Sequence, residues 1–267
     1  MSSHLFLRTW RAQRAKLLVV AVGLAIWGAV LPIVYEAFRD EIQFIIASGL
    51  IPEQLTQFGG GDILSLPGTI ALGFIHPIAV ALVLVFALGF AVTAVAGERQ
   101  RGTLEVLLAR PLSRRRIYLT LLIATVLFVA LAIAAQVLGI VIGSSLSGDI
   151  GELRPERLAL MWLNGVLVFA ALGSVGLATS VSFDRLTPAL ALSLTFILIS
   201  YFLHVLGSMW TAARGLQPWS LFYYLDPKGA LSGTMTSGDW LVPLGVFCVG
   251  LVVALVVFPR RDLAAPA

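Results

Sequence analysis

Residues 97–116, GERQRGTLEVLLARPLSRRR, are strongly polar and separate two long apolar runs. Gly102 interrupts any helix that leaves the apolar run before it. Pro111 stops any helix that follows, because proline lacks an amide hydrogen and clashes with the preceding turn. About two helical turns fit between these two residues. The sequence therefore predicts a polar loop that contains one short helix.

This short helix has one apolar side. Leu104, Leu107 and Leu108 recur at helical spacing, while Glu105 points elsewhere and follows Arg101 by four residues. Isolated helices shorter than about 12–15 residues are marginal in water, so this one needs a partner surface or the bilayer interface. The pattern indicates a docking segment. An ordinary positively charged loop beside the membrane is the alternative.

The composition is that of an integral membrane protein. Of the 267 residues, 59% are hydrophobic and 12% are charged, and the mean hydropathy is +0.97. Soluble domains contain about 25% charged residues. A helix needs about 20 apolar residues to cross a hydrocarbon core about 30 Å thick. We predict an all-α protein with six transmembrane helices, at residues 17–34, 67–96, 117–142, 158–181, 188–210 and 240–258.

Basic residues indicate how these spans are oriented. With both termini cytoplasmic, thirteen Lys and Arg residues lie inside and five lie outside, as the positive-inside rule requires. The loop at 97–116 and a tail at 259–267 are then cytoplasmic, and residues 17–258 form a single membrane domain in the cell membrane. The isoelectric point of about 9.6 reflects this topology. Nucleic-acid binding is not expected, because no soluble basic domain exists to carry it.

Residues 1–16 have the pattern of an interfacial helix. Leu5, Phe6 and Trp10 share one side, and basic residues that reach lipid head groups surround them: Arg8, Arg11, Arg14 and Lys16. We expect this helix to lie on the inner leaflet in contact with membrane lipid, with a frayed tail as the alternative. Because the first apolar run is a full span long, we expect no removable secretory signal.

Enzymatic motifs are absent from the sequence. No G-x-x-x-x-G-K-[ST] phosphate loop, H-E-x-x-H, C-x-x-C or G-x-S-x-G occurs, so we expect no enzyme, no bound cofactor and no metal site in this chain. Ser174 and His204, on different spans, would allow an intramembrane serine protease. The preferred interpretation of Ser174 is that small residues let membrane helices approach closely.

Polar residues inside the spans are few. The centres of all six spans lack Asp, Glu, Lys and Arg, which argues against a proton- or ion-coupled carrier. Four polar side chains are candidates for a translocation path: His76, Gln136, Asn164 and His204. The alternative is that each bonds to a neighbouring helix. Gly139 and Gly143 form a G-x-x-x-G pair that would allow a close helix crossing.

The polar loop resembles the signature of a known family. Its matching residues are Glu98, Gly102 to Glu105, Leu107, Leu108, Arg110, Pro111, Ser113 and Arg114. Together they resemble the loop of type-2 ATP-binding-cassette (ABC) exporter permeases, a family of multidrug, antibiotic, polysaccharide and copper-processing transporters. The likeness extends to the six spans and to the position of the loop between spans two and three.

The resemblance implies that residues from about 103 to 109 form a coupling helix, which docks in a groove of a separate cytoplasmic ABC ATPase. It implies two ATPase copies, which bind ATP and Mg²⁺, and a second permease copy or a related permease. The residues that it assigns to coupling are Glu98, Arg101, Gly102, Thr103, Leu104, Glu105, Leu107, Leu108 and Pro111.

We therefore expect the permease subunit of an ATP-driven exporter. The apolar interior favours an amphiphilic or hydrophobic substrate such as a drug, antibiotic or lipid. Two alternatives stay open at this point. One is a permease-like subunit that transmits force to an extracytoplasmic partner, and the other is a membrane scaffold or sensor component without transport.

Overall fold

The computed structural model describes residues 2–47, 65–104 and 112–261, which form helices without a strand among them. The long helices are α1 (Ser3–Ala47), α7 (Arg114–Ser147), α8 (Pro155–Ser182), α9 (Leu186–Met209) and α11 (Gly238–Arg260). The short α-helices are α3 (Leu66–Ile75), α4 (Pro77–Leu84), α5 (Glu98–Gln100) and α10 (Pro227–Ser232). Two segments are π-helical, η1 (Val85–Phe90) and η2 (Thr93–Gly97), and three are 3₁₀-helical, η3 (Asp149–Glu152), η4 (Thr211–Trp219) and η5 (Leu221–Tyr224).

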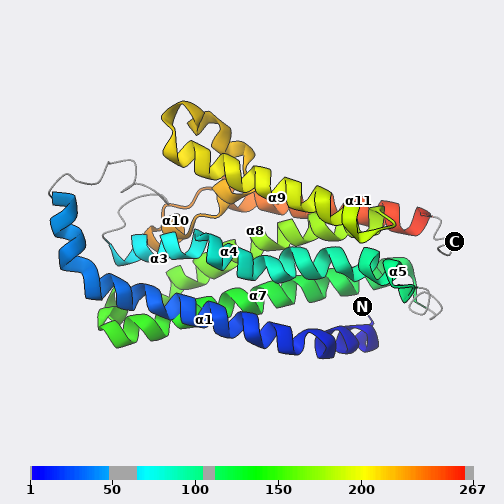
Figure 1. Cartoon of the computed structure of the whole chain (residues 1–267), viewed down its shortest axis with the longest axis horizontal. Coiled ribbons are helices and arrows are strands. Elements are labelled where there is room, and N and C mark those ends of the chain that lie inside the picture. Colours follow the sequence, from blue (N-terminus) through cyan, green and yellow to red (C-terminus); the bar gives the residue numbers. More distant parts are fainter. Residues whose placement is uncertain (1, 48–64, 105–111, 262–267) are drawn as a thin grey trace.

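The long helices run side by side in one bundle (Figure 1). Helix α1 packs against α7, α7 packs against α8, and α8 packs against α9 and α11. The first residues of α1, the short helix α5 and the last residues of α11 lie together at one end of the bundle (Figure 1), which we call the terminal end. Helix α10 lies toward the opposite, distal end.

Among the described residues, five helices are long and apolar enough to cross a membrane: α1, α7, α8, α9 and α11. Helices α3 and α4, the latter continued by η1, form a pair bent by 46° that would be a sixth span if counted as one. The chain is thus a multi-pass membrane protein. The expected span at 67–96 coincides with this bent pair and its continuation, and within it His76 has an extended backbone and ends α3. A residue before proline is pushed out of the helical region, and Pro77 follows.

Side chains bond to backbone groups at the start of α3 and at this break. The Ser65 hydroxyl accepts from Gly68 N at 3.1 Å, and His76 Nδ1 accepts from Ile78 N at 3.3 Å. From α1, Trp27 Nε1 donates to Gly73 O at 2.9 Å. Unpaired backbone groups are costly in a bilayer, so these bonds are what make a broken helix tolerable there.

The segment that leads into the polar loop is also irregular. It is π-helical at η1 and η2, and Ser180 of α8, which is fully buried, bonds to backbone groups at η2. Ser180 Oγ accepts from Val95 N at 3.1 Å and from Ala96 N at 3.0 Å, and it donates to Val92 O at 2.7 Å. All the hydrogen-bonding capacity of the hydroxyl is used. Helix α8 therefore fixes the end of this span.

Helix α1 differs from the expected pair of helices. No boundary occurs at residue 17, because residues 11–17 contain neither glycine nor proline, and one helix runs from Ser3 to Ala47. Its first turns are not a frayed tail, since Leu5 is buried and the ring of Trp10 stacks on Phe128 with centroids 5.8 Å apart. The location of these turns on the inner leaflet stays a prediction.

Helices α1 and α7 approach closely along a seam of glycines. A Cβ atom at Gly139 would overlap the backbone of Ala25, and one at Gly143 would overlap that of Ala29. From the other side, a Cβ atom at Gly28 would overlap the carbonyl oxygen of Gln136. The G-x-x-x-G pair thus sets a close crossing, as the sequence predicted. We call these contacts the glycine seam.

Replacing Gly139 by alanine should destabilise the fold, because the added methyl group overlaps the α1 backbone and forces the helices apart. Overpacking costs about 1–3 kcal/mol at such sites. The melting temperature of the purified protein in detergent measures this effect. Gly245→Ala is the matched control, because nothing lies within 4 Å of its added Cβ. Equal melting temperatures for the two variants would contradict the close crossing.

Candidate functional site

The polar loop begins with a tight turn after η2. Helix α5 ends at Gln100, and Gly102, two residues further on, has a φ of +69°, in the left-handed region that favours glycine. Gly102 N donates to Arg99 O at 2.9 Å, and Thr103 N donates to Glu98 O at 2.9 Å. This is a common way for a helix to end. The prediction that Gly102 interrupts the helix is confirmed.

The side chain of Glu98 stabilises this turn through bonds to two of its residues. Its carboxylate accepts from Arg101 Nη2 at 2.5 Å and from Thr103 Oγ1 at 2.7 Å. Burial by itself would raise the pKa of this carboxyl. The bonds from Thr103 and Arg101, with the charges of Arg101 and Arg8, outweigh burial and hold the pKa below its ordinary value. Glu98 is therefore ionised near neutral pH and fixes the direction of the loop.

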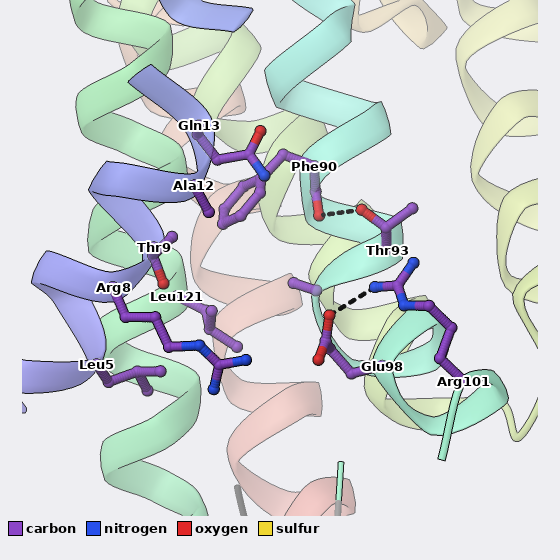
Figure 2. A pocket seen from close by; sticks show the side chains of 11 residues that line it. Leu5, Arg8, Thr9, Ala12, Gln13, Phe90, Thr93, Glu98, Arg101 and Leu121 are labelled. Atoms are coloured by element: carbon purple, nitrogen blue, oxygen red, sulfur yellow. Dashed lines mark hydrogen bonds and ion pairs between the residues drawn. The ribbon is translucent and has the colours of Figure 1, made fainter. Parts of the chain in front are cut away.

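A cavity of about 130 Å³ separates this turn from the start of α1. Figure 2 shows Arg8 on one side of the cavity and Glu98 with Arg101 on the other. The remaining wall comes from α1, from the span that leads into the loop, and from α7: Leu5, Thr9, Ala12, Gln13, Phe90, Thr93, Ala94 and Leu121. The first turns of α1 and the base of the loop therefore face each other across one cavity.

The structure describes part of the expected docking segment. Glu98, Arg101, Gly102 and Thr103 form the turn above, and Leu104 is 3% exposed, so its side chain faces the protein interior. Glu105, Leu107, Leu108 and Pro111 lie outside the described residues. The docking role of the segment stays a prediction.

Asn164, a candidate for the translocation path, is a buried structural anchor. Its Nδ2 donates to Tyr224 O at 2.9 Å and to Asp239 O at 3.1 Å, and its Oδ1 accepts from Asp226 N at 3.0 Å. It thus ties the connection between α9 and α11 to α8 near the distal end. These bonds fit the alternative that the sequence left open, in which polar span residues bond to neighbouring segments.

The other three candidates do not form one path. His76 and His204 line the same small cavity of about 20 Å³, with Tyr201 and Ser208 also in its wall. Gln136 lies elsewhere, buried on α7 at the glycine seam, and its Nε2 has no hydrogen-bond partner within the described part of the chain. The structure therefore brings two of the four candidates together and separates the others.

The protease alternative lacks its essential contact. Ser174 is fully buried, its hydroxyl donates to Ala171 O at 2.8 Å, and it lies against Gly250 of α11. Among the described residues, His204 is placed beside His76 and not beside Ser174. A buried hydroxyl that bonds within its own helix cannot act as an activated nucleophile.

Sequence reasoning missed a charged cluster at the terminal end. Asp184, between α8 and α9, forms ion pairs with Arg99 of α5 and with Arg261, which follows α11. We call these three residues the Asp184 cluster. The sequence did contain a sign of this cluster, because Asp184 is among the few acidic residues on the predicted cytoplasmic side. Its partners, however, depend on how the helices pack.

Replacing Asn164 by leucine, which has a similar shape, should destabilise the protein. Three backbone groups, one buried and two partly buried, lose a partner, and each loss at a buried group costs about 1–3 kcal/mol. Thermal unfolding of the purified protein in detergent measures the change. The control is Ser145→Ala, since this exposed hydroxyl bonds only within its own helix. Unchanged unfolding of the leucine variant would show that Asn164 does not anchor the connection.

Comparison with known proteins agrees with this arrangement. The family model described as "ABC-2 family transporter protein" matches residues 10–263, almost the whole chain. A search of curated proteins found no match. The matched range includes the bundle, the turn at Glu98 and the Asp184 cluster. The chain belongs to the ABC-2 family of transporter proteins and is a membrane permease component.

Proposed function

We propose that this permease subunit exports an amphiphilic or hydrophobic substrate with energy from ATP hydrolysed by a separate ABC ATPase. The observation that carries the proposal is the family match over residues 10–263. It is supported by the loop base, where Glu98 fixes the start of a short polar segment at the terminal end. Both chain ends are proposed to be cytoplasmic in the cell membrane, with membrane lipid around the spans.

The ATPase is proposed to dock on residues 97–116. The sequence has no phosphate-loop motif, so ATP and Mg²⁺ belong on the partner. We infer an assembly of two ATPase copies and two permeases, either two copies of this chain or this chain with a related permease. Closure of the ATPases would move the loop, and rigid-body rotation of the helices would alternate access to the two sides.

An apolar groove supports the choice of substrate class. It has a volume of about 750 Å³, its floor is α8, and α9 and α11 supply its walls. The lining includes Leu192 and Phe196 of α9 and Val246 and Val249 of α11. Pockets with such linings suit apolar ligands, and none of the described residues that line this one is ionised.

Cysteine labelling tests the proposed orientation. In a Cys248→Ser background, Ser237→Cys at the distal end should react with a membrane-impermeant maleimide in intact cells. Ser3→Cys should react only after the membrane is permeabilised, because its end of the bundle is cytoplasmic. Both side chains are exposed. Labelling of Ser3→Cys in intact cells would reverse the orientation.

Co-purification tests the ATPase partner. The tagged chain should recover a stoichiometric ATPase with a phosphate loop, and Leu107→Asp should reduce its recovery and the coupled ATPase rate by roughly 30-fold or more, as expected for a central interface residue. Leu216→Asp is the control, because this leucine is 45% exposed in η4, away from the loop.

Recovery of the chain alone would contradict the exporter proposal and favour a scaffold or sensor component. Recovery of the ATPase together with an extracytoplasmic protein, without transport, would favour a force-transmitting subunit.

A further inference from the structure

Three segments that are far apart in the sequence meet at Asp184. One carboxylate oxygen, Oδ1, pairs with Arg99 at the base of the polar loop and with Arg261 at the end of α11. Asp184 itself lies immediately before α9. A single side chain thus contacts the loop base and the end of α11 at the point where α9 begins.

Neighbouring hydrogen bonds fix the same three segments. Gln100 Oε1 accepts from Leu186 N at 3.0 Å, which joins the loop base to the first residue of α9. Arg261 Nη1 donates to Val181 O at 3.0 Å, which joins the end of α11 to α8. Arg114 Nη1 donates to Phe258 O at 3.1 Å and to Arg261 O at 2.5 Å. The Asp184 cluster therefore lies within a continuous polar network.

Stability does not account well for this cluster. The Asp184 side chain is 59% exposed, and ion pairs that water reaches contribute little to folding. The two arginine side chains are largely covered, at 15% and 21% exposed, so their directions are fixed by the surrounding protein. An exposed carboxylate between two guanidinium groups of fixed direction adds little to the stability of the fold. It can, however, pass a movement of one segment on to the other.

The helices joined by Asp184 are the two walls of the apolar groove. Helices α9 and α11 are the most peripheral spans, with 22% of their central windows buried, compared with 61% for α7 and α8. Helix α8, the floor, is held within the core. Peripheral helices are those most able to move against a fixed core.

We propose that Asp184 is the positioning residue that transmits displacement of the polar loop to α9 and α11 and so sets the width of the groove between them. This inference rests on the proposed function, because the displacement comes from the ATPase. Arg99 receives the motion, and Arg261 carries it to α11. Asp184 contacts neither nucleotide nor substrate, and it acts through these two arginines.

The test measures the groove directly in the complex with the ATPase, reconstituted in lipid nanodiscs. In a Cys248→Ser background, Leu194→Cys on α9 and Val252→Cys on α11 place spin labels on exposed positions of both walls. ATP with vanadate should shift the distance between the labels. Asp184→Asn should reduce the shifted population by a factor of roughly 2 to 30, the range seen for residues between coupled sites, while ATP hydrolysis continues.

Three controls separate transmission from structure. Asp184→Glu keeps the carboxylate and should retain the shift, and Arg185→Gln removes an exposed charge from the same loop and should have no effect. The double variant Asp184→Asn with Arg261→Gln should lose no more of the shift than Asp184→Asn alone, because Arg261 receives the motion only through Asp184. The melting temperature of Asp184→Asn should match that of the parent.

A full shift in Asp184→Asn would overturn the inference and leave the exporter proposal intact. An unmodified complex that hydrolyses ATP without any shift would also overturn the inference. Failure to recover an ATPase at all would contradict the proposed function, and the inference would fall with it.

Discussion

The close approach of α1 and α7 is the constraint on which the rest of the structure depends. Between helices in a bilayer there is no hydrophobic gain comparable to that in water, so association depends on packing and on polar contacts. The glycine seam supplies that packing by letting the two backbones touch. Because α1 is one unbroken helix, the seam also positions its first turns, which form one side of the cavity beside Glu98.

Irregular backbone occurs in the span between α1 and α7, and two of its irregularities, the bend at His76 and the end at η2, have a hydrogen-bond partner on another helix. Trp27 bonds at the bend near Pro77, and Ser180 bonds at the π-helical end. Such backbone is tolerated at membrane depth only where protein surrounds it. The regular helices α1 and α8 are therefore what permit the intervening span to be irregular, and this span leads directly into the polar loop.

Sequence reasoning predicted the features that depend on local chemistry. The apolar runs indicated the spans because hydrocarbon thickness fixes their length, Gly102 indicated the end of α5, and the glycine pair indicated a close crossing. It missed the bend at His76, although Pro77 was visible, because many membrane helices keep a proline without breaking. It could not predict that Asn164 anchors the α9–α11 connection or that Asp184 joins Arg99 to Arg261. Those partners lie 60 or more residues away and are set only by packing.

The two π-helical segments before Glu98 also determine the direction in which the following side chains point around the helix axis. Each π-turn adds about one residue without adding a turn, so every side chain beyond it is rotated by about 100° relative to a regular helix. The direction in which Glu98 faces Arg8 therefore depends on the extra residues at η1 and η2, and Ser180 bonds to the backbone at η2. The number of residues between Leu84 and Glu98 therefore matters, because inserting or deleting a single residue would turn the polar loop toward a different neighbour.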